Sequence, residues 1–184
     1  MSKVIYDQQK FKELVLLLAV KCKDHPLFGA VKLNKQLFWA DFLAYKELGK
    51  PITGARYQAL EWGPAPVPFI PVREEMIGDE EIQVERSGQQ DRVVARRKPD
   101  MSYFSKEEKR IVNRVVRRLE HGDWKQVSDA SHKFIGWKAA QAEAEVTGKR
   151  VVIPYGTINV STKRPSRKQW AIGKELATKY EWRI

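Results

Sequence analysis

The first 25 residues place apolar side chains at helical spacing. One stripe, within a sector of about 100°, consists of Phe11, Leu14, Val15, Leu18 and Cys22. Leu16, Leu17 and Val20 lie outside this stripe, so we expect the helix to be covered on more than one side. Asp7 is a suitable N-cap, and Pro26 ends the pattern because a proline disfavours helical backbone in the preceding residue.

A second helical pattern runs from about Val31 to Leu48 and stops at Gly49. Its apolar positions are Leu33, Leu37, Phe38, Ala40, Phe42, Ala44 and Tyr45. The next stretch, 51–71, carries five prolines and two glycines around a short extended piece at Tyr57–Trp62. It predicts an ordered loop or short strand leading into a helix start, followed by a helical turn at Arg73–Ile77.

The second half of the chain begins with alternating segments and then becomes helical. Ile82–Arg86 and Arg92–Arg96 predict a β-hairpin. Ser105 and Glu108 form a capping box that opens a helix ending at Gly122. Its apolar side holds Ile111, Val112, Val115, Val116 and Leu119, and its other side holds Lys106, Arg110, Arg114, Arg117, Arg118 and His121. Further helices are expected at about 125–134, 137–145 and 166–182.

These patterns predict a mainly α fold of the α+β class. We expect a compact helical domain over residues 1–160 with a small β-hairpin or short sheet, and a basic C-terminal tail or helix over residues 161–184. A length of 184 residues suits one ordinary domain with a short appendage. The apolar content of 42% supplies a core and excludes the disordered class of proteins.

The net charge of +11 indicates an anionic partner: nucleic acid, an anionic membrane surface or an acidic protein. The tail concentrates this charge, because its seven lysines and arginines face only Glu175 and Glu181. The longest apolar run, Leu14–Val20, is too short for a membrane span of about 20 residues. The N-terminus carries no secretory pattern, so we expect a cytoplasmic protein.

Signatures of catalysis and metal binding are absent from the sequence. The histidines, His25, His121 and His132, are in no zinc-binding arrangement, and the lone cysteine, Cys22, excludes an internal disulfide and suits a buried position. No phosphate-binding loop, dinucleotide fingerprint or nucleophile elbow is present. The acidic residues between 74 and 81 are interpreted as solvated. We therefore expect no enzyme, no metal and no cofactor.

Three segments together resemble the Panacea-domain (SocA-like) antitoxin family. The segments are VKLNKQLFWAD at 31–41, PITGARYQALEWGP at 51–64, and Ser105-x-x-Glu108 followed by VSDASH at 127–132 and Trp137. Their order and spacing match the family over roughly residues 11–155. Ser131 stands where the family usually has threonine, Ala65 where valine is common, and the basic tail lies outside the resemblance.

The resemblance implies a bacterial or phage antitoxin that neutralises a partner toxin by forming a complex with it. Some family members present the toxin to a protease, and the shared domain does not identify the toxin. The matching residues, which serve either the fold or an interface, are Lys32, Leu33, Lys35, Leu37, Phe38, Asp41, Tyr57, Trp62, Gly63, Pro64, His132 and Trp137. The residues themselves favour core packing, a glycine-dependent turn and a structural histidine.

The candidate partner-binding residues are cationic or aromatic, as is common at the energetic centres of interfaces. They are Arg110, Arg114, Arg117, Arg118, Trp170, Tyr180 and Trp182. Two alternatives stay open: the tail helix packs on the domain, or the basic surfaces bind nucleic acid, although no nucleic-acid motif is legible. An enzyme is the least favoured hypothesis, with His132 as its best catalytic candidate. The sequence does not indicate an oligomeric state.

Overall fold

The computed structural model describes residues 4–87, 90–160 and 166–179. These residues form seven α-helices, two 3-10 helices and two small antiparallel sheets of two strands each. The predicted class, mainly α with a small β component, is confirmed.

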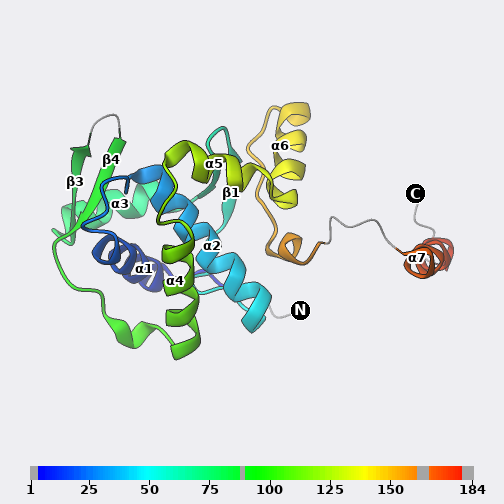
Figure 1. The fold of residues 1–184 in the computed structure, drawn as a ribbon, viewed down its shortest axis with the longest axis horizontal. Coiled ribbons are helices and arrows are strands. Elements are labelled where there is room, and N and C mark those ends of the chain that lie inside the picture. The colour runs from blue at the N-terminus through cyan, green and yellow to red at the C-terminus, as the bar shows by residue number, and fades with distance from the viewer. Residues whose placement is uncertain (1–3, 88–89, 161–165, 180–184) are drawn as a thin grey trace.

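Helix α2 (Ala30–Leu48) is the centre of the fold. It packs against α1 (Gln8–Lys21), α4 (Lys106–Arg118), α5 (Trp124–His132) and strand β2 (Gly63–Pro66), and Figure 1 shows it running between these elements. Ten of its 19 residues are buried, which requires neighbours on several sides. It ends as predicted at Gly49, whose φ of 75° is left-handed.

Helix α1 is capped by Asp7, which accepts a hydrogen bond from the amide of Lys10 at 2.9 Å. Leu16 and Leu17 are buried, so the expectation of cover on more than one side is confirmed. Val20 was wrongly grouped with them: it lies in the last turn of the helix, at an open hollow beside residues 92–95, and is 37% exposed. Helix α1 ends at Lys21, several residues before the end that was predicted from Pro26.

Strand β1 (Tyr57–Leu60) and β2 form an antiparallel hairpin in which Leu60 pairs with Gly63 and Tyr57 with Pro66. The sequence indicated only one extended piece here, because two prolines in a four-residue strand disfavour a strand assignment. Helix α3 (Phe69–Gly78) follows and is longer than the predicted turn. Pro71 fits within it because the first helical turn needs no N–H donor.

Strands β3 (Ile82–Ser87) and β4 (Gln90–Ala95) form the predicted second hairpin. The preceding acidic residues are not simply solvated, as the sequence interpretation had it. The Lys12 ammonium, on a nearly buried side chain of α1, lies 2.8 Å from Glu75, 3.3 Å from Asp79 and 3.7 Å from Glu81. These carboxylates therefore join α3 and the start of β3 to α1, a contact between segments that local sequence does not indicate because Lys12 and Asp79, for example, are 67 residues apart.

The remaining elements are the 3-10 helix η1 (Met101–Tyr103), α6 (Ile135–Thr147), the 3-10 helix η2 (Tyr155–Asn159) and α7 (Arg167–Lys179). The predicted capping box of α4 is present, with Ser105 and Glu108 bonded reciprocally. Figure 1 shows α7 apart from the other helices. None of the helices in the described ranges is both long and apolar enough to span a bilayer.

Candidate functional site

The motif residues of α2, the β1–β2 hairpin and α5 meet in a buried polar cluster, here called the motif junction (Lys35, Gly63, Pro64, Ser128 and Ser131). The Lys35 ammonium donates to the Pro64 carbonyl at 3.1 Å. Ser131 Oγ donates to the Ser128 carbonyl at 2.6 Å. The Gly63 Cα packs so closely against both that an added Cβ would collide with Ser131 Oγ and lie 2.7 Å from Lys35 Cε. Only glycine fits at this position, which also has a left-handed φ of 91°.

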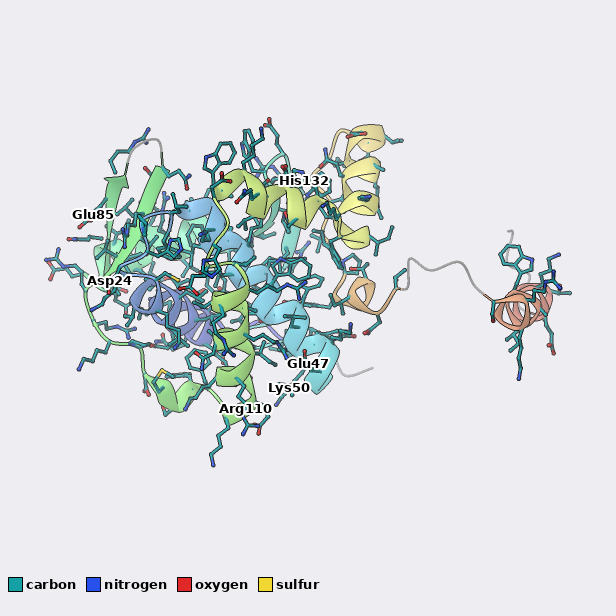
Figure 2. The ribbon with its side chains drawn as sticks, viewed as in Figure 1. Asp24, Glu47, Lys50, Glu85, Arg110 and His132 are labelled. Atoms are coloured by element: carbon teal, nitrogen blue, oxygen red, sulfur yellow. The ribbon has the colours of Figure 1, made fainter. Side chains whose placement is uncertain are left out.

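Helices α5 and α6 are joined to the same hairpin by two hydrogen bonds to its carbonyls. Ser128 Oγ donates to Trp62 O at 3.0 Å, and Trp137 Nε1 donates to Leu60 O at 3.2 Å. The His132 ring stacks on the Trp137 indole, with centroids 4.1 Å apart, and its Nε2 lies 3.4 Å from Ser128 Oγ. Figure 2 shows His132 at the end of α5, well away from Arg110. His132 therefore has the environment of a structural histidine.

A second buried polar cluster surrounds the carboxylate of Asp41 on α2, which is completely inaccessible. It accepts hydrogen bonds from the Thr53 amide at 2.7 Å, Thr53 Oγ1 at 2.5 Å, the Tyr57 hydroxyl at 2.8 Å and the Tyr155 hydroxyl at 3.3 Å. These partners come from the loop after α2, from β1 and from η2. The Asp41 carboxylate thus holds three separate segments against α2.

Burial controls the protonation of these groups. It lowers the pKa of Lys35 to about 7 and raises the pKa of Asp41 and of Tyr57. Burial, together with the nearby Lys35 charge, also lowers the pKa of His132, so this ring stays neutral at neutral pH. A shifted lysine beside a serine can indicate catalysis. Here Lys35 is 2% exposed and Ser131 is fully buried, so a substrate cannot reach them.

The other matching residues are also mostly interior. Leu33, Leu37 and Phe38 belong to the core, and the nearly buried Lys32 donates to the Glu120 carbonyl at 3.2 Å. Trp62 is the exception: it is 51% exposed at the tip of the hairpin, in edge-to-face contact with Trp124.

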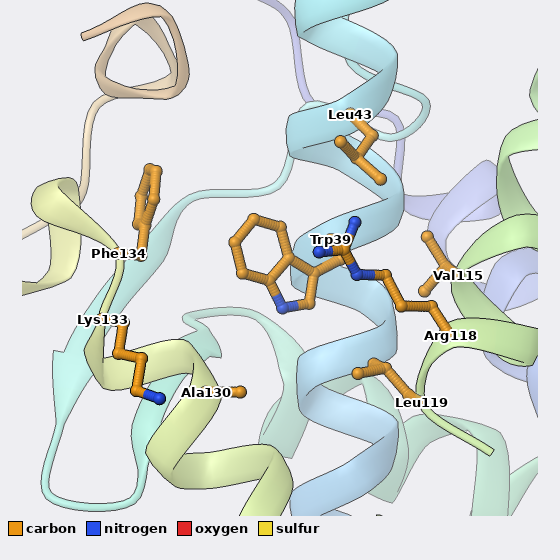
Figure 3. A pocket seen from close by; sticks show the side chains of 8 residues that line it. All are labelled: Trp39, Leu43, Val115, Arg118, Leu119, Ala130, Lys133 and Phe134. Carbon is orange, nitrogen blue, oxygen red and sulfur yellow. The ribbon is translucent and has the colours of Figure 1, made fainter. Parts of the chain in front are cut away.

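The accessible site lies on the other side of α2, in a groove that α2, α4 and α5 form, here called the Trp39 groove. It has a volume of about 290 Å³ and is lined by Trp39, Leu43, Val115, Arg118, Leu119, Ala130, Lys133 and Phe134. Figure 3 shows the Trp39 indole between Phe134 on one side and Arg118 on the other. The groove combines an apolar interior with two cationic side chains, an arrangement suited to binding an apolar group that carries negative charge nearby.

Of the five predicted partner-binding residues that the structure describes, Arg118 alone lines this groove. Arg110, Arg114 and Arg117 are exposed on α4, where Arg114 forms an ion pair with Glu47 at 2.5 Å. Figure 2 shows Glu47, Lys50 and Arg110 near this end of the molecule. Trp170 is 53% exposed on α7. Tyr180 and Trp182 lie outside the described residues.

Trp39, Lys133 and Phe134 were not among the predicted site residues. Trp39 carried a usable signal: two consecutive large aromatics on one helix, Phe38 and Trp39, point about 100° apart, so both cannot face the same part of the core. Lys133 and Phe134 carried none, because only the packing of α5 on α2 brings them beside Trp39. Among the residues that the structure describes, no cluster of three histidine, cysteine or acidic side chains is arranged to hold a metal ion.

A comparison with protein families identifies the family of this chain. A family model described as "Antitoxin SocA-like, Panacea domain" matches residues 33–138, more than half of the chain. This range begins within α2 and includes the motif junction and every residue that lines the Trp39 groove. No curated protein and no solved structure matches the chain.

Proposed function

Because the chain belongs to the SocA-like Panacea-domain antitoxin family, we propose that it is an antitoxin that neutralises a partner toxin by direct protein–protein binding. Neutralisation of this kind requires a complementary surface, and a stable interface typically buries about 1,600 Å² in total. One observation carries the proposal: the motif residues that identify the family mostly form the interior of the fold, and the accessible surface is left to other residues. Most of the motif residues are buried in the scaffold, as Lys35 and Asp41 illustrate, and Trp62 is the exposed one.

We further propose that the protein neutralises the toxin without a catalytic centre of its own. Three polar groups with displaced pKa values, Lys35, Asp41 and Tyr57, are each bonded to neighbouring segments and closed to solvent. Substitution of His132, the best catalytic candidate by sequence, provides the test. We expect a His132→Ala variant that folds normally to protect as well as the wild type does.

The main experiment is co-expression with the protein encoded by the adjacent gene, followed by affinity capture and size-exclusion chromatography. Rescue of growth together with a co-eluting complex is expected. Rescue without a lasting complex would argue against direct inhibition and for a mechanism in which the protein delivers the toxin to a protease. If neither rescue nor complex is found, the antitoxin proposal fails for that pair.

Nucleic-acid binding is the second candidate function, and the exposed cations of α4 favour it. Arg110 and Arg117 are solvent-exposed and form no ion pair with a described residue, so they are free to contact phosphates. Binding of this kind weakens steeply with salt because it releases condensed counterions. Titration of labelled double-stranded DNA and RNA at low and high salt tests it. Undetectable binding at low salt would remove this candidate.

A further inference from the structure

We infer that the Trp39 groove is the docking site for an acidic segment of the partner protein, one that inserts a single large apolar side chain between Arg118 and Lys133. The inference rests on the proposed function and adds to it the location and chemistry of the interface. Its basis is the interior of the groove, its rim and its size.

The interior of the groove is aromatic and aliphatic, with contributions from all three helices. Trp39 is half-buried and packs edge-to-face on Phe134, with centroids 5.6 Å apart. Leu119 and Val115 form a nearly buried floor from α4. A rigid aromatic surface that remains partly open is typical of binding hot spots, because it offers a large contact area at a small cost in side-chain entropy.

The rim determines the charge of the occupant. Arg118 and Lys133 stand on opposite helices, both exposed, and neither forms an ion pair with any residue that the structure describes. Arg114, one turn away on α4, differs because Glu47 already neutralises it. Two unpaired cations beside an apolar surface complement a segment with carboxylates on either side of an apolar residue. The same charges disfavour docking of α7, which is itself rich in lysine and arginine.

The size of the groove limits what it can hold. At about 290 Å³ it lies at the lower end of the range for small-molecule sites, roughly 300–1,000 Å³. It therefore accommodates one leucine or aromatic side chain with its neighbouring backbone rather than a cofactor. The rest of the interface would lie on the surface immediately around the rim of the groove, near Arg118 and Lys133.

The first arm of the test uses the co-expressed adjacent-gene protein and two groove variants. Arg118→Glu/Lys133→Glu reverses the rim, and Ala130→Phe fills the groove from an exposed position. Each should weaken the complex by about tenfold or more. The controls are Arg110→Glu/Lys125→Glu, which makes the same charge change eight residues earlier on each helix, and Ala142→Phe on the exposed face of α6. The controls should retain wild-type affinity.

The second arm needs no toxin. The full-length chain, labelled with nitrogen-15 at tryptophan, is titrated with the peptide EDLFLDE and, separately, with KKLFLKK. We expect a saturable shift of the Trp39 indole signal, assigned with Trp39→Phe, for the acidic peptide only, and its loss in Ala130→Phe. No shift, or an equal shift with the basic peptide, overturns the inference.

The two arms separate failure of the inference from failure of the proposed function. If the wild type binds the adjacent-gene protein and the groove variants bind equally well, the groove inference is wrong while the antitoxin proposal stands. If the wild type does not bind that protein, the antitoxin proposal fails for the pair and the peptide arm alone decides the groove. A homodimer that Ala130→Phe dissociates, or DNA binding that the rim reversal abolishes, assigns the groove to another occupant and overturns the inference.

Discussion

Two ionisable side chains of α2, Lys35 and Asp41, are almost completely removed from water. The protein accommodates them differently. Asp41 accepts four hydrogen bonds from three residues, whereas Lys35 donates one to a backbone carbonyl. A buried charge is costly unless donors and acceptors satisfy it, so these two residues should have opposite effects on stability when replaced.

Lys35 should make stability depend on pH. Its pKa in the folded state is about 7, against 10.5 for an exposed lysine, so the unfolded chain binds more protons between these values. The free energy of unfolding therefore rises with pH above 7, by about 2–3 kcal/mol up to pH 9 from this group. Below pH 7 the folded state carries the buried charge and the contribution is at its minimum.

Replacement of Lys35 by methionine should abolish that rise. The measurement is the free energy of unfolding by urea at pH 6 and at pH 9. Subtracting the change in the variant from the change in the wild type cancels the contributions of the other titrating groups. We expect Lys35→Met to be more stable than the wild type at pH 6, because the lost hydrogen bond is worth only about 1 kcal/mol. Lys46→Met, an exposed position on the same helix, is the control. Equal pH dependence in Lys35→Met and wild type would disprove the buried-charge argument.

Asp41 should behave in the opposite way. Asp41→Ala leaves the Thr53 amide and the hydroxyls of Thr53 and Tyr57 without their acceptor inside the core, so we expect a loss of about 3–5 kcal/mol in the free energy of unfolding. Chemical denaturation at pH 7 provides the measurement. Asp129→Ala, an exposed aspartate on α5, should change stability by less than about 0.5 kcal/mol. A loss as small as that control at Asp41 would contradict the proposed role of this cluster.

At the scale of elements, the β1–β2 hairpin connects most of the fold. One face of it receives Lys35 from α2, and its carbonyls accept from α5 and α6. Its free edge pairs with the segment after α6: the Ile153 amide donates to Tyr57 O at 2.7 Å, and the Ala59 amide donates to Val151 O at 3.1 Å. A short hairpin therefore positions four segments that are distant in sequence.

Gly63 is the position at which this hairpin tolerates least change. Gly63→Ala should cost about 2–4 kcal/mol, because it combines a left-handed backbone with a collision against Ser131 and Lys35. Gly148→Ala separates the two effects, since φ there is 65° but no atom lies within 4 Å of the added Cβ. That variant should lose only about 1 kcal/mol. Thermal unfolding of both variants measures the difference, and equal losses would show that the packing at Gly63 is unimportant.

For the whole molecule, the described structure separates a scaffold from its surfaces. The buried motif clusters surround α2, while the Trp39 groove and the cations of α4 face solvent. Helix α7 adds little to the scaffold: its described side chains, Trp170 and Ile172 included, are all exposed.

Removal of residues 161–184 should leave the stability of the remaining chain unchanged. Since the described side chains of α7 bury little area, the Tm should shift by less than about 2 °C, as measured by circular dichroism. A decrease of several degrees would instead show that the tail packs on the domain. The same truncation, tested for protection in co-expression, decides whether the tail belongs to the interface.

Local sequence is sufficient to predict some features of this fold. The caps at Asp7 and Ser105, the stop at Gly49 and the hairpin at 82–95 were predictable because each depends on residues a few positions apart. The β1–β2 pairing was not, since its prolines argue against a strand. The ion pairs of Lys12 were missed for the same reason as the groove: their partners are distant in the chain.

The sequence by itself determined the helical periodicity, the mainly α class and the family, because these depend on residue order and short-range spacing. Only the tertiary structure decided which motif residues are buried and which surface remains open. Burial is a property of packing: α5 and the hairpin enclose Lys35, while the same packing leaves Trp39 partly open beside Arg118 and Lys133, which pair with no described acidic residue. The most recognisable residues therefore maintain the scaffold, and the proposed contact surface consists of residues that only the fold brings together.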